Sequence, residues 1–154
     1  MTFHTLTERD VDPLRAFLRD ADLTLAGLDE PTVRLWMERD EAGTVIGSTG
    51  FELNQDGNHA LIRSVAVAPE RRAAGAGSRL AMFALDQAAQ AGASRAWLFS
   101  RRSGPFWQKL GFTHADRERL AAVLPDTQQV RLFVQTGQLG TEIAWSRDLA
   151  NLSQ

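Results

Sequence analysis

The chain has 154 residues, the usual length of one domain, and we expect residues 1–154 to form a single domain. With 44% hydrophobic residues, 23% charged residues and a net charge of -2, it has the composition of a globular protein and no general positive field, so neither nucleic acid nor a membrane is an expected partner. The absence of cysteine excludes disulfides, thiolate metal sites and a cysteine nucleophile, and the absence of an apolar signal core predicts a cytoplasmic location.

The first half of the chain predicts one helix and an antiparallel meander. Thr7 is a predicted N-cap with Asp10 three residues on, and apolar residues at helical spacing follow it. Asp56 and Gly57 are typical of a type I′ hairpin turn between two strands. The predicted strands cover residues 3–6, 33–39, 44–54 and 59–68.

The second half alternates helices with short strands. The predicted helices cover residues 78–91, 105–110, 117–124 and 126–136. The predicted strands cover residues 95–100, 112–115 and 141–148. Together these elements predict an α/β (α+β) fold, in which helices flank a central mixed, mostly antiparallel sheet.

Arg72 to Gly77 spells R-x-x-G-x-G between the end of a strand at Pro69 and a helix expected from Ser78. Glycines let the backbone approach a ligand closely, and the free N–H groups of a helix N-terminus carry partial positive charge. This combination is suited to a pyrophosphate. The alternative is a glycine-containing turn that simply opens an alanine-rich helix.

A second motif follows about 30 residues later, where residues 106–112 read FWQKLGF after a strand. The two motifs in this order resemble the GNAT superfamily of N-acetyltransferases. "SVAVAPERRAAGAGSRLAMFAL" is similar to the family's acetyl-CoA motif, and "PFWQKLGF" to its "FYEKLGF" helix. Within the superfamily, "RSVAVAP", "GFEL" and an "LP" near the tail resemble the small acetyltransferases found with arsenic-resistance genes.

The resemblance implies an enzyme that moves the acetyl group of acetyl-CoA to a primary amine of a small molecule by direct attack, without a metal. A protein N-acetyltransferase and a non-catalytic acyl-CoA-binding domain are the alternatives, and a homodimer is one oligomeric state left open. The backbone of Val65 and Val67 would bind the pantetheine arm as an added strand does. The residues implied to cradle the pyrophosphate are Arg72, Ala73, Ala74, Gly75, Ala76, Gly77 and Ser78.

The family's usual proton donor to the thiolate is a tyrosine, and this chain contains none. Trp107 occupies that position, and an indole N–H donates a hydrogen bond but does not give up a proton near neutral pH. Water, Ser100 or Ser103 would have to serve, or the thiolate leaves unassisted, since a thiol has a pKa of about 8.5.

The family's usual catalytic Glu is replaced by Leu61. A two-residue turn at Asp56-Gly57 would put Glu52 directly opposite Leu61, with Arg63 diagonal to it on the same face. Glu52 is therefore a candidate base, acting directly or through water, and the alternatives are an ion pair with Arg63 or a substrate anchor.

Two further arginines are candidates for binding charged groups. Arg101 and Arg102 follow a predicted strand end, where they could bind a substrate carboxylate or the coenzyme phosphates. The alternative is a solvated basic loop. Arg63 and Arg101 are the residues that we assign to the substrate. The three histidines show no metal-ligand spacing.

Overall fold

The computed structural model describes residues 3–72 and 75–150 of the chain. Its strands are β1 (His4–Thr5), β2 (Val33–Arg39), β3 (Val45–Leu53), β4 (His59–Val67), β5 (Arg95–Phe99), β6 (Thr113–Ala115) and β7 (Ala144–Asp148). Its α-helices are α1 (Val11–Asp20), α2 (Ala76–Gln90), α3 (Gly104–Lys109), α4 (Arg117–Val123) and α5 (Gln128–Thr136). Each corresponds to an element predicted from the sequence.

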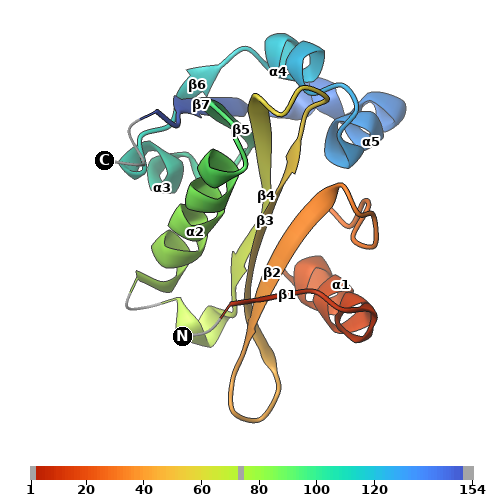
Figure 1. The fold of residues 1–154 in the computed structure, drawn as a ribbon, viewed down its shortest axis with the longest axis vertical. Helices are drawn as coiled ribbons and strands as arrows, with labels where there is room; N and C mark the ends of the chain where they lie inside the picture. The colour runs from red at the N-terminus through yellow and green to blue at the C-terminus, as the bar shows by residue number, and fades with distance from the viewer. Residues whose placement is uncertain (1–2, 73–74, 151–154) are drawn as a thin grey trace.

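The strands form one sheet in the order β1-β2-β3-β4-β5-β7-β6. Only β4 and β5 pair in parallel, and every other neighbouring pair is antiparallel. Helices α2 and α3 cover one face, while α1 and α5 lie against the other (Figure 1). The expected fold class, a mixed and mostly antiparallel sheet flanked by helices, is confirmed.

The two faces of the sheet bury separate apolar clusters. On the α2 face, Ala81, Ala84 and Leu85 pack with Phe51 and Ile62. On the opposite face, one cluster lies under α1 and a second lies under α4 and α5. Because helices cover both faces, β3 is buried along nearly its whole length, polar residues such as Ser48 and Thr49 included, and its burial shows no alternation.

The β3–β4 hairpin has the predicted register but a different turn. Glu52 pairs with Leu61, as predicted. However, Asp56 does not have the positive φ that a type I′ turn requires, and only Gly57 does, at 78°. The N–H of Asn54 donates to the carbonyl of His59 at 3.0 Å, which leaves residues 55–58 as the connection, and within it the N–H of Gly57 donates to the carbonyl of Asn54 at 3.1 Å. Because this longer loop has the same centre as the predicted turn, the register is unchanged.

Thr7 and Asp10 form the predicted capping box at the start of the first helical segment. The Asp10 carboxylate accepts from the Thr7 N–H at 2.9 Å and pairs with Arg39 of β2 at 2.8 Å. The hydrogen bond from Arg39, followed by that from the Thr7 backbone, lowers the pKa of Asp10 from 3.8 to about 2. This carboxylate therefore ties the entry of α1 to the sheet.

Replacing Asp10 by Asn is expected to lower the free energy of unfolding at pH 7 by about 1–2 kcal/mol. Because the folded-state pKa is depressed, the stabilisation is complete above the unfolded value of 3.8 and is lost as the pH falls through about 2. Urea denaturation at pH 7 and at pH 2–3 should show the difference between Asp10→Asn and wild type shrinking with acid. Asp12→Asn, in an exposed pair with Arg15, is the control, and an equal pH dependence in both variants would contradict the assignment.

Candidate active site

A cleft of about 640 Å³ lies between the second half of β4 and the start of α3. Strand β4 pairs with β5 only from His59 to Leu61, and beyond that point the two strands separate. The far edge of β4 therefore has no strand partner among the described residues. The cleft is lined by Ala21, Leu23, Val65, Ala66, Val67, Arg72, Gly75, Gly77, Ser78, Arg102, Ser103, Phe106 and Trp107.

A bulge at Ser64 accompanies this separation. Ser64 has a φ of 62°, rare for a residue with a Cβ, and the register with β3 shifts by one residue around it. The Ser48 hydroxyl stabilises the bulge by donating to the Ser64 carbonyl at 2.6 Å. The extra residue reverses the alternation of β4, so that Val65 packs on the α2 face while Ala66 packs on the α1 face.

Helix α2 points its N-terminus at the cleft. Gly75 is the N-cap with a φ of 75°, and among the described residues no side-chain hydrogen bond caps the helix and no acidic group lies in its first turn. The first N–H groups of the helix therefore have no intrahelical acceptor and carry the positive end of the helix dipole. The helix begins at Ala76 instead of the predicted Ser78, because glycine accepts the left-handed conformation that starts it.

Aromatic side chains of α3 close the other side of the cleft. Trp107 is buried and packs edge-on against Phe106 and Phe112, with ring centroids 5.0 and 5.3 Å apart. A Cβ added to Gly77 would lie 3.4 Å from a Phe106 ring carbon and 3.8 Å from a Val67 methyl. Glycine at this position therefore keeps the gap between α2, α3 and β4 open.

The structure brings most of the predicted coenzyme residues to this one cleft. Ala76 is buried next to the lining residues, whereas the assignments of Ala73 and Ala74 fall outside the described residues. Of the predicted catalytic residues, Trp107 lines the cleft and Ser100 does not. The predicted coenzyme residues that line the cleft are Val65, Val67, Arg72, Gly75, Gly77 and Ser78.

Glu52 and Arg63 lie on the α1–α5 face of the sheet and do not line the cleft. They form an ion pair at 2.9 Å with exposures of only 1% and 4%. Burial lowers the pKa of the Arg63 guanidinium, and the charge of Glu52 opposes this shift. The geometry matches the ion-pair alternative, while the role of Glu52 as a base stays a prediction.

The Glu52 carboxylate also caps α5. It accepts from the backbone N–H of Gln128 at 2.6 Å and of Gln129 at 3.3 Å. Arg63 in turn donates to the Ser64 hydroxyl at 3.2 Å and to the Thr24 carbonyl at 3.4 Å. One buried pair thus connects the bulge, the loop after α1 and the start of α5. The spacing of residues in the sequence does not predict these contacts.

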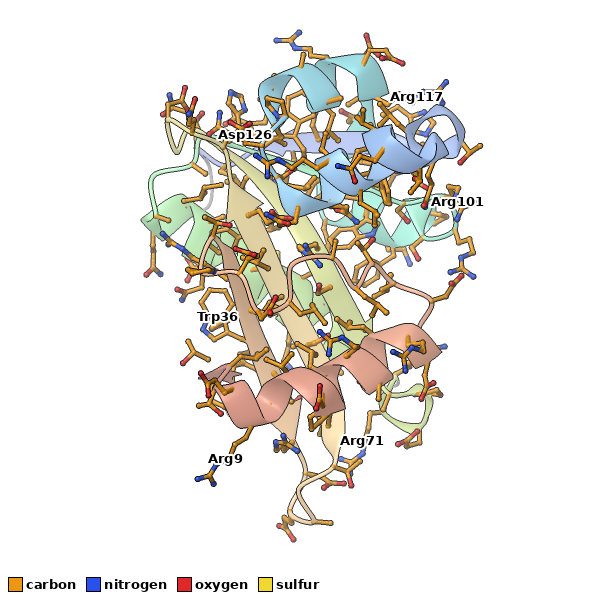
Figure 2. The ribbon with its side chains drawn as sticks, turned by 90° about the vertical axis from the view of Figure 1, so that its right-hand side faces the viewer. Arg9, Trp36, Arg71, Arg101, Arg117 and Asp126 are labelled. Atoms are coloured by element: carbon orange, nitrogen blue, oxygen red, sulfur yellow. The ribbon has the colours of Figure 1, made fainter. Side chains whose placement is uncertain are left out.

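A second cavity of about 120 Å³ adjoins the cleft. It shares Leu23, Arg102 and Ser103 with the cleft, and its own lining includes Ser100 and Arg101. Arg101 pairs with Glu142 at 3.2 Å and is half-exposed. Figure 2 shows Arg101 and Arg117 on the same side of the molecule, and Arg117 donates to the Glu142 carbonyl at 3.1 Å.

The described ranges contain neither a cluster of metal-binding side chains nor a helix that could span a membrane. No group of three or more histidine or acidic side chains there could hold a metal ion. No helix in the same part of the chain is long and apolar enough to cross a membrane.

Comparison with solved structures shows the fold of known acetyltransferases. An acetyltransferase of the GNAT family from Staphylococcus aureus is 13% identical, with a TM-score of 0.72 over 96% of this chain and 98% of that one. An aminoglycoside 6′-N-acetyltransferase complexed with coenzyme A is 13% identical, with a TM-score of 0.67 over 97% of both chains.

N-acetylglutamate synthase from Neisseria gonorrhoeae, complexed with coenzyme A and N-acetyl-glutamate, is 17% identical, with a TM-score of 0.73 over 97% of this chain. This chain spans only about a third, 35%, of the length of that synthase. At these identities the likeness shows the fold alone. A comparison with curated protein sequences found no match.

The sequence comparison with protein families is more specific. The family described as the acetyltransferase (GNAT) family matches residues 3–112, which include the whole β4–α2 motif and the FWQKLGF helix. This match covers well over half of the chain. The chain therefore belongs to the acetyltransferase (GNAT) family, as an acyltransferase with acetyl-CoA as its co-substrate.

Proposed function

We propose that this protein transfers the acetyl group of acetyl-CoA to the primary amine of a small molecule. The observation that carries the proposal is that one cleft is lined both by the edge of β4 at Val65–Val67, which has no strand partner among the described residues, and by the N-terminus of α2. The Val67 carbonyl on this edge accepts from the Arg72 side chain at 3.4 Å. A strand edge and a helix N-terminus are the two backbone features that bind an extended amide chain and a pyrophosphate, respectively.

In this proposal the pyrophosphate lies in the turn from Arg72 to Ser78. The N–H groups at the start of α2 donate to the phosphate oxygens, and Arg72 adds a positive charge beside them. Ala73 and Ala74 belong to the same turn by sequence. The pantetheine arm extends along Val65 and Val67, which places the thioester near Trp107 and the junction with the smaller cavity.

The size of the smaller cavity favours a small molecule as the acceptor, in preference to the terminus or a side chain of a protein. Its volume is only about 120 Å³, and it opens beside the thioester end of the cleft. Structural neighbours include an aminoglycoside acetyltransferase and N-acetylglutamate synthase, which support the same class of acceptor.

The reaction needs a neutral amine, because the nitrogen lone pair must attack the thioester carbonyl. The C–N bond forms, the C–S bond breaks, the amine proton is released and the thiolate is left to be protonated. The described lining of the cleft includes no carboxylate or histidine, so the proton leaves through solvent or by way of Glu52. Ser103 lines the cleft and can protonate the thiolate through water. Ser100 does not line the cleft, and its hydroxyl oxygen accepts a hydrogen bond from the Ser103 N–H at 3.1 Å.

The proposed subtype is a small acetyltransferase of the kind found with arsenic-resistance genes, and it rests on the sequence resemblance alone. Since the chain has no cysteine, it has no thiolates with which to hold a soft metalloid ion. A role in arsenic resistance would therefore consist of acetylating a compound that carries an amine.

Replacing Gly77 by Glu is expected to weaken acetyl-CoA binding by at least about tenfold. A carboxylate there would meet the pyrophosphate at the helix N-terminus, and its side chain would fill the narrow gap beside Phe106. Calorimetric titration with acetyl-CoA measures the change. Gln55→Glu adds the same charge to the exposed hairpin loop as a control, and unchanged affinity in Gly77→Glu would overturn the coenzyme assignment.

Glu52→Gln separates the two roles of that carboxylate. Because Glu52 is the ion-pair partner of buried Arg63, loss of its charge is expected to lower the free energy of unfolding by about 3–5 kcal/mol. Asp126→Asn, in an exposed pair with Arg131, should change stability by no more than about 1 kcal/mol. If Glu52→Gln keeps its melting temperature but loses about 10²–10⁴ in kcat, with partial rescue at high pH, Glu52 is a base and not a structural ion pair.

Trp107→Phe is expected to retain turnover within about tenfold of wild type, because an indole supplies packing and no proton. The assay follows release of the CoA thiol from acetyl-CoA with a panel of primary amines. The proposed function requires amine-dependent release by the wild type, and its absence with every amine would overturn it. A loss of several hundredfold in kcat for Trp107→Phe, with coenzyme affinity kept, would show that the indole takes part in the chemistry.

A further inference from the structure

A groove of about 390 Å³ lies beside the outer edge of β2, at the end of the sheet opposite β6 and β7 (Figure 1). Strand β1 pairs with β2 only at Trp36 and Met37, so the β2 edge at Val33–Leu35 has no strand partner on that side among the described residues. The described linings of this groove and of the coenzyme cleft have no residue in common. What binds in the groove is therefore independent of the proposed function.

The base of the groove is apolar. Leu28, Val33 and Leu35 line it and are buried in the cluster under α1. Leu6 and Val11 also line it, are half-buried, and pack against the same cluster. A ligand that covers this surface gains free energy by removing apolar area from water.

Three carboxylates line the same groove, and they belong to Glu8, Asp29 and Glu30. All three residues are exposed, and none of them forms an ion pair within the part of the chain that the structure describes. The lining also includes Arg34, whose guanidinium lies over the Phe51 ring, 5.7 Å from its centroid. Phe51 belongs to the cluster under α2, so Arg34 is drawn to the other face of the sheet. The three carboxylates are therefore available to a positively charged ligand.

The distribution of charge along the chain favours the same sign of ligand. Residues 1–56, which supply β1, α1, β2 and β3, contain twelve acidic and five basic residues. Residues 57–154, which supply α2 and α3, contain seven acidic and twelve basic residues. The groove thus belongs to the negative half of the chain, and long-range attraction directs a cation toward it.

We infer that this groove binds an extended segment of a partner protein in which arginine or lysine alternates with apolar residues. The segment lies where a longer β1 would continue along Val33–Leu35. Successive side chains of an extended chain point to opposite sides, so one set covers the apolar base while the other reaches Glu8, Asp29 and Glu30. A small cation would meet the carboxylates but leave the apolar base uncovered.

Amide chemical shifts of the isotope-labelled protein test this assignment. The probe is a blocked heptapeptide that alternates valine with arginine, and its counterpart has glutamate in place of arginine. We expect saturable shifts at Leu6, Leu28 and Leu35 with the arginine peptide, and binding at least about tenfold weaker with the glutamate peptide. Val65 and Gly77 in the coenzyme cleft should not shift. Equal affinity for the two peptides, or shifts confined to the cleft, would overturn the inference.

N-Ethylguanidinium distinguishes a peptide from a small cation. It carries the charge of an arginine side chain but covers little of the apolar base, so its affinity should be at least about tenfold below that of the arginine peptide. Affinity equal to that of the peptide would make the groove a site for small cations and would refute its assignment to a protein segment.

Asp29→Asn combined with Glu30→Gln removes two of the three charges. The double variant is expected to bind the arginine peptide about fivefold or more weakly. Its melting temperature should match that of the wild type, because both carboxylates are exposed and unpaired within the described ranges. Glu41→Gln is the matched control, since Glu41 is exposed in the turn between β2 and β3 and lies outside the lining. Unchanged affinity in the double variant, or an equal loss in Glu41→Gln, would contradict the inference.

Discussion

Past Leu61, strand β4 loses its parallel neighbour β5, and the bulge at Ser64 turns its outer edge into the wall of a cleft. Backbone N–H and C=O groups of a strand need partners, and a separated edge inside a sheet offers them to an extended ligand. The same bulge shifts the side-chain alternation by one residue, so Val65 joins the cluster under α2. Residues 68–75 separate this edge from the start of α2 in the sequence, so the proposed coenzyme site combines two backbone features that are close together in the chain.

The Glu52–Arg63 pair links this edge to the rest of the site. Two charges removed from water cost several kcal/mol each, which their attraction offsets only when their remaining hydrogen-bonding groups are also satisfied. Here the carboxylate accepts from the first N–H groups of α5, and the guanidinium donates to Ser64 and Thr24. The pair therefore stabilises less by its own attraction than by fixing three segments relative to one another. The same contacts determine where the wall of the smaller cavity lies.

Local patterns in the sequence predicted most of this fold. Strand and helix periodicity identified each element, and the Arg72–Gly77 pattern identified a segment whose described residues line the cleft, because these signals depend on residues near one another in the chain. The pairing of Glu52 with Leu61 was also predictable, since a hairpin register follows from where its turn is centred. The turn type was not, because a four-residue loop with Gly57 in the left-handed conformation has the same centre as a type I′ turn.

The features that the sequence did not predict depend on packing between residues that are far apart in the chain. Nothing in the residues around Ser64 indicates a bulge, because serine is not a residue that favours positive φ, and the bulge is stabilised by Ser48 on the neighbouring strand. The capping of α5 by Glu52 joins residues 76 positions apart. Gln129 reads as an ordinary polar residue of a helix, and only its burial and unpaired oxygen distinguish it. Such features arise from how the elements pack together, which periodicity and motif spacing do not encode.

A crystal structure of this protein with coenzyme A bound would test the central claim most directly. The account predicts the pantetheine arm beside Val65 and Val67 with backbone hydrogen bonds to β4. It also predicts pyrophosphate oxygens about 3 Å from the N–H groups that begin α2, and the sulfur near Trp107 and the smaller cavity. Coenzyme bound elsewhere, or a β4 that pairs with β5 beyond Leu61 and closes the cleft, would contradict it.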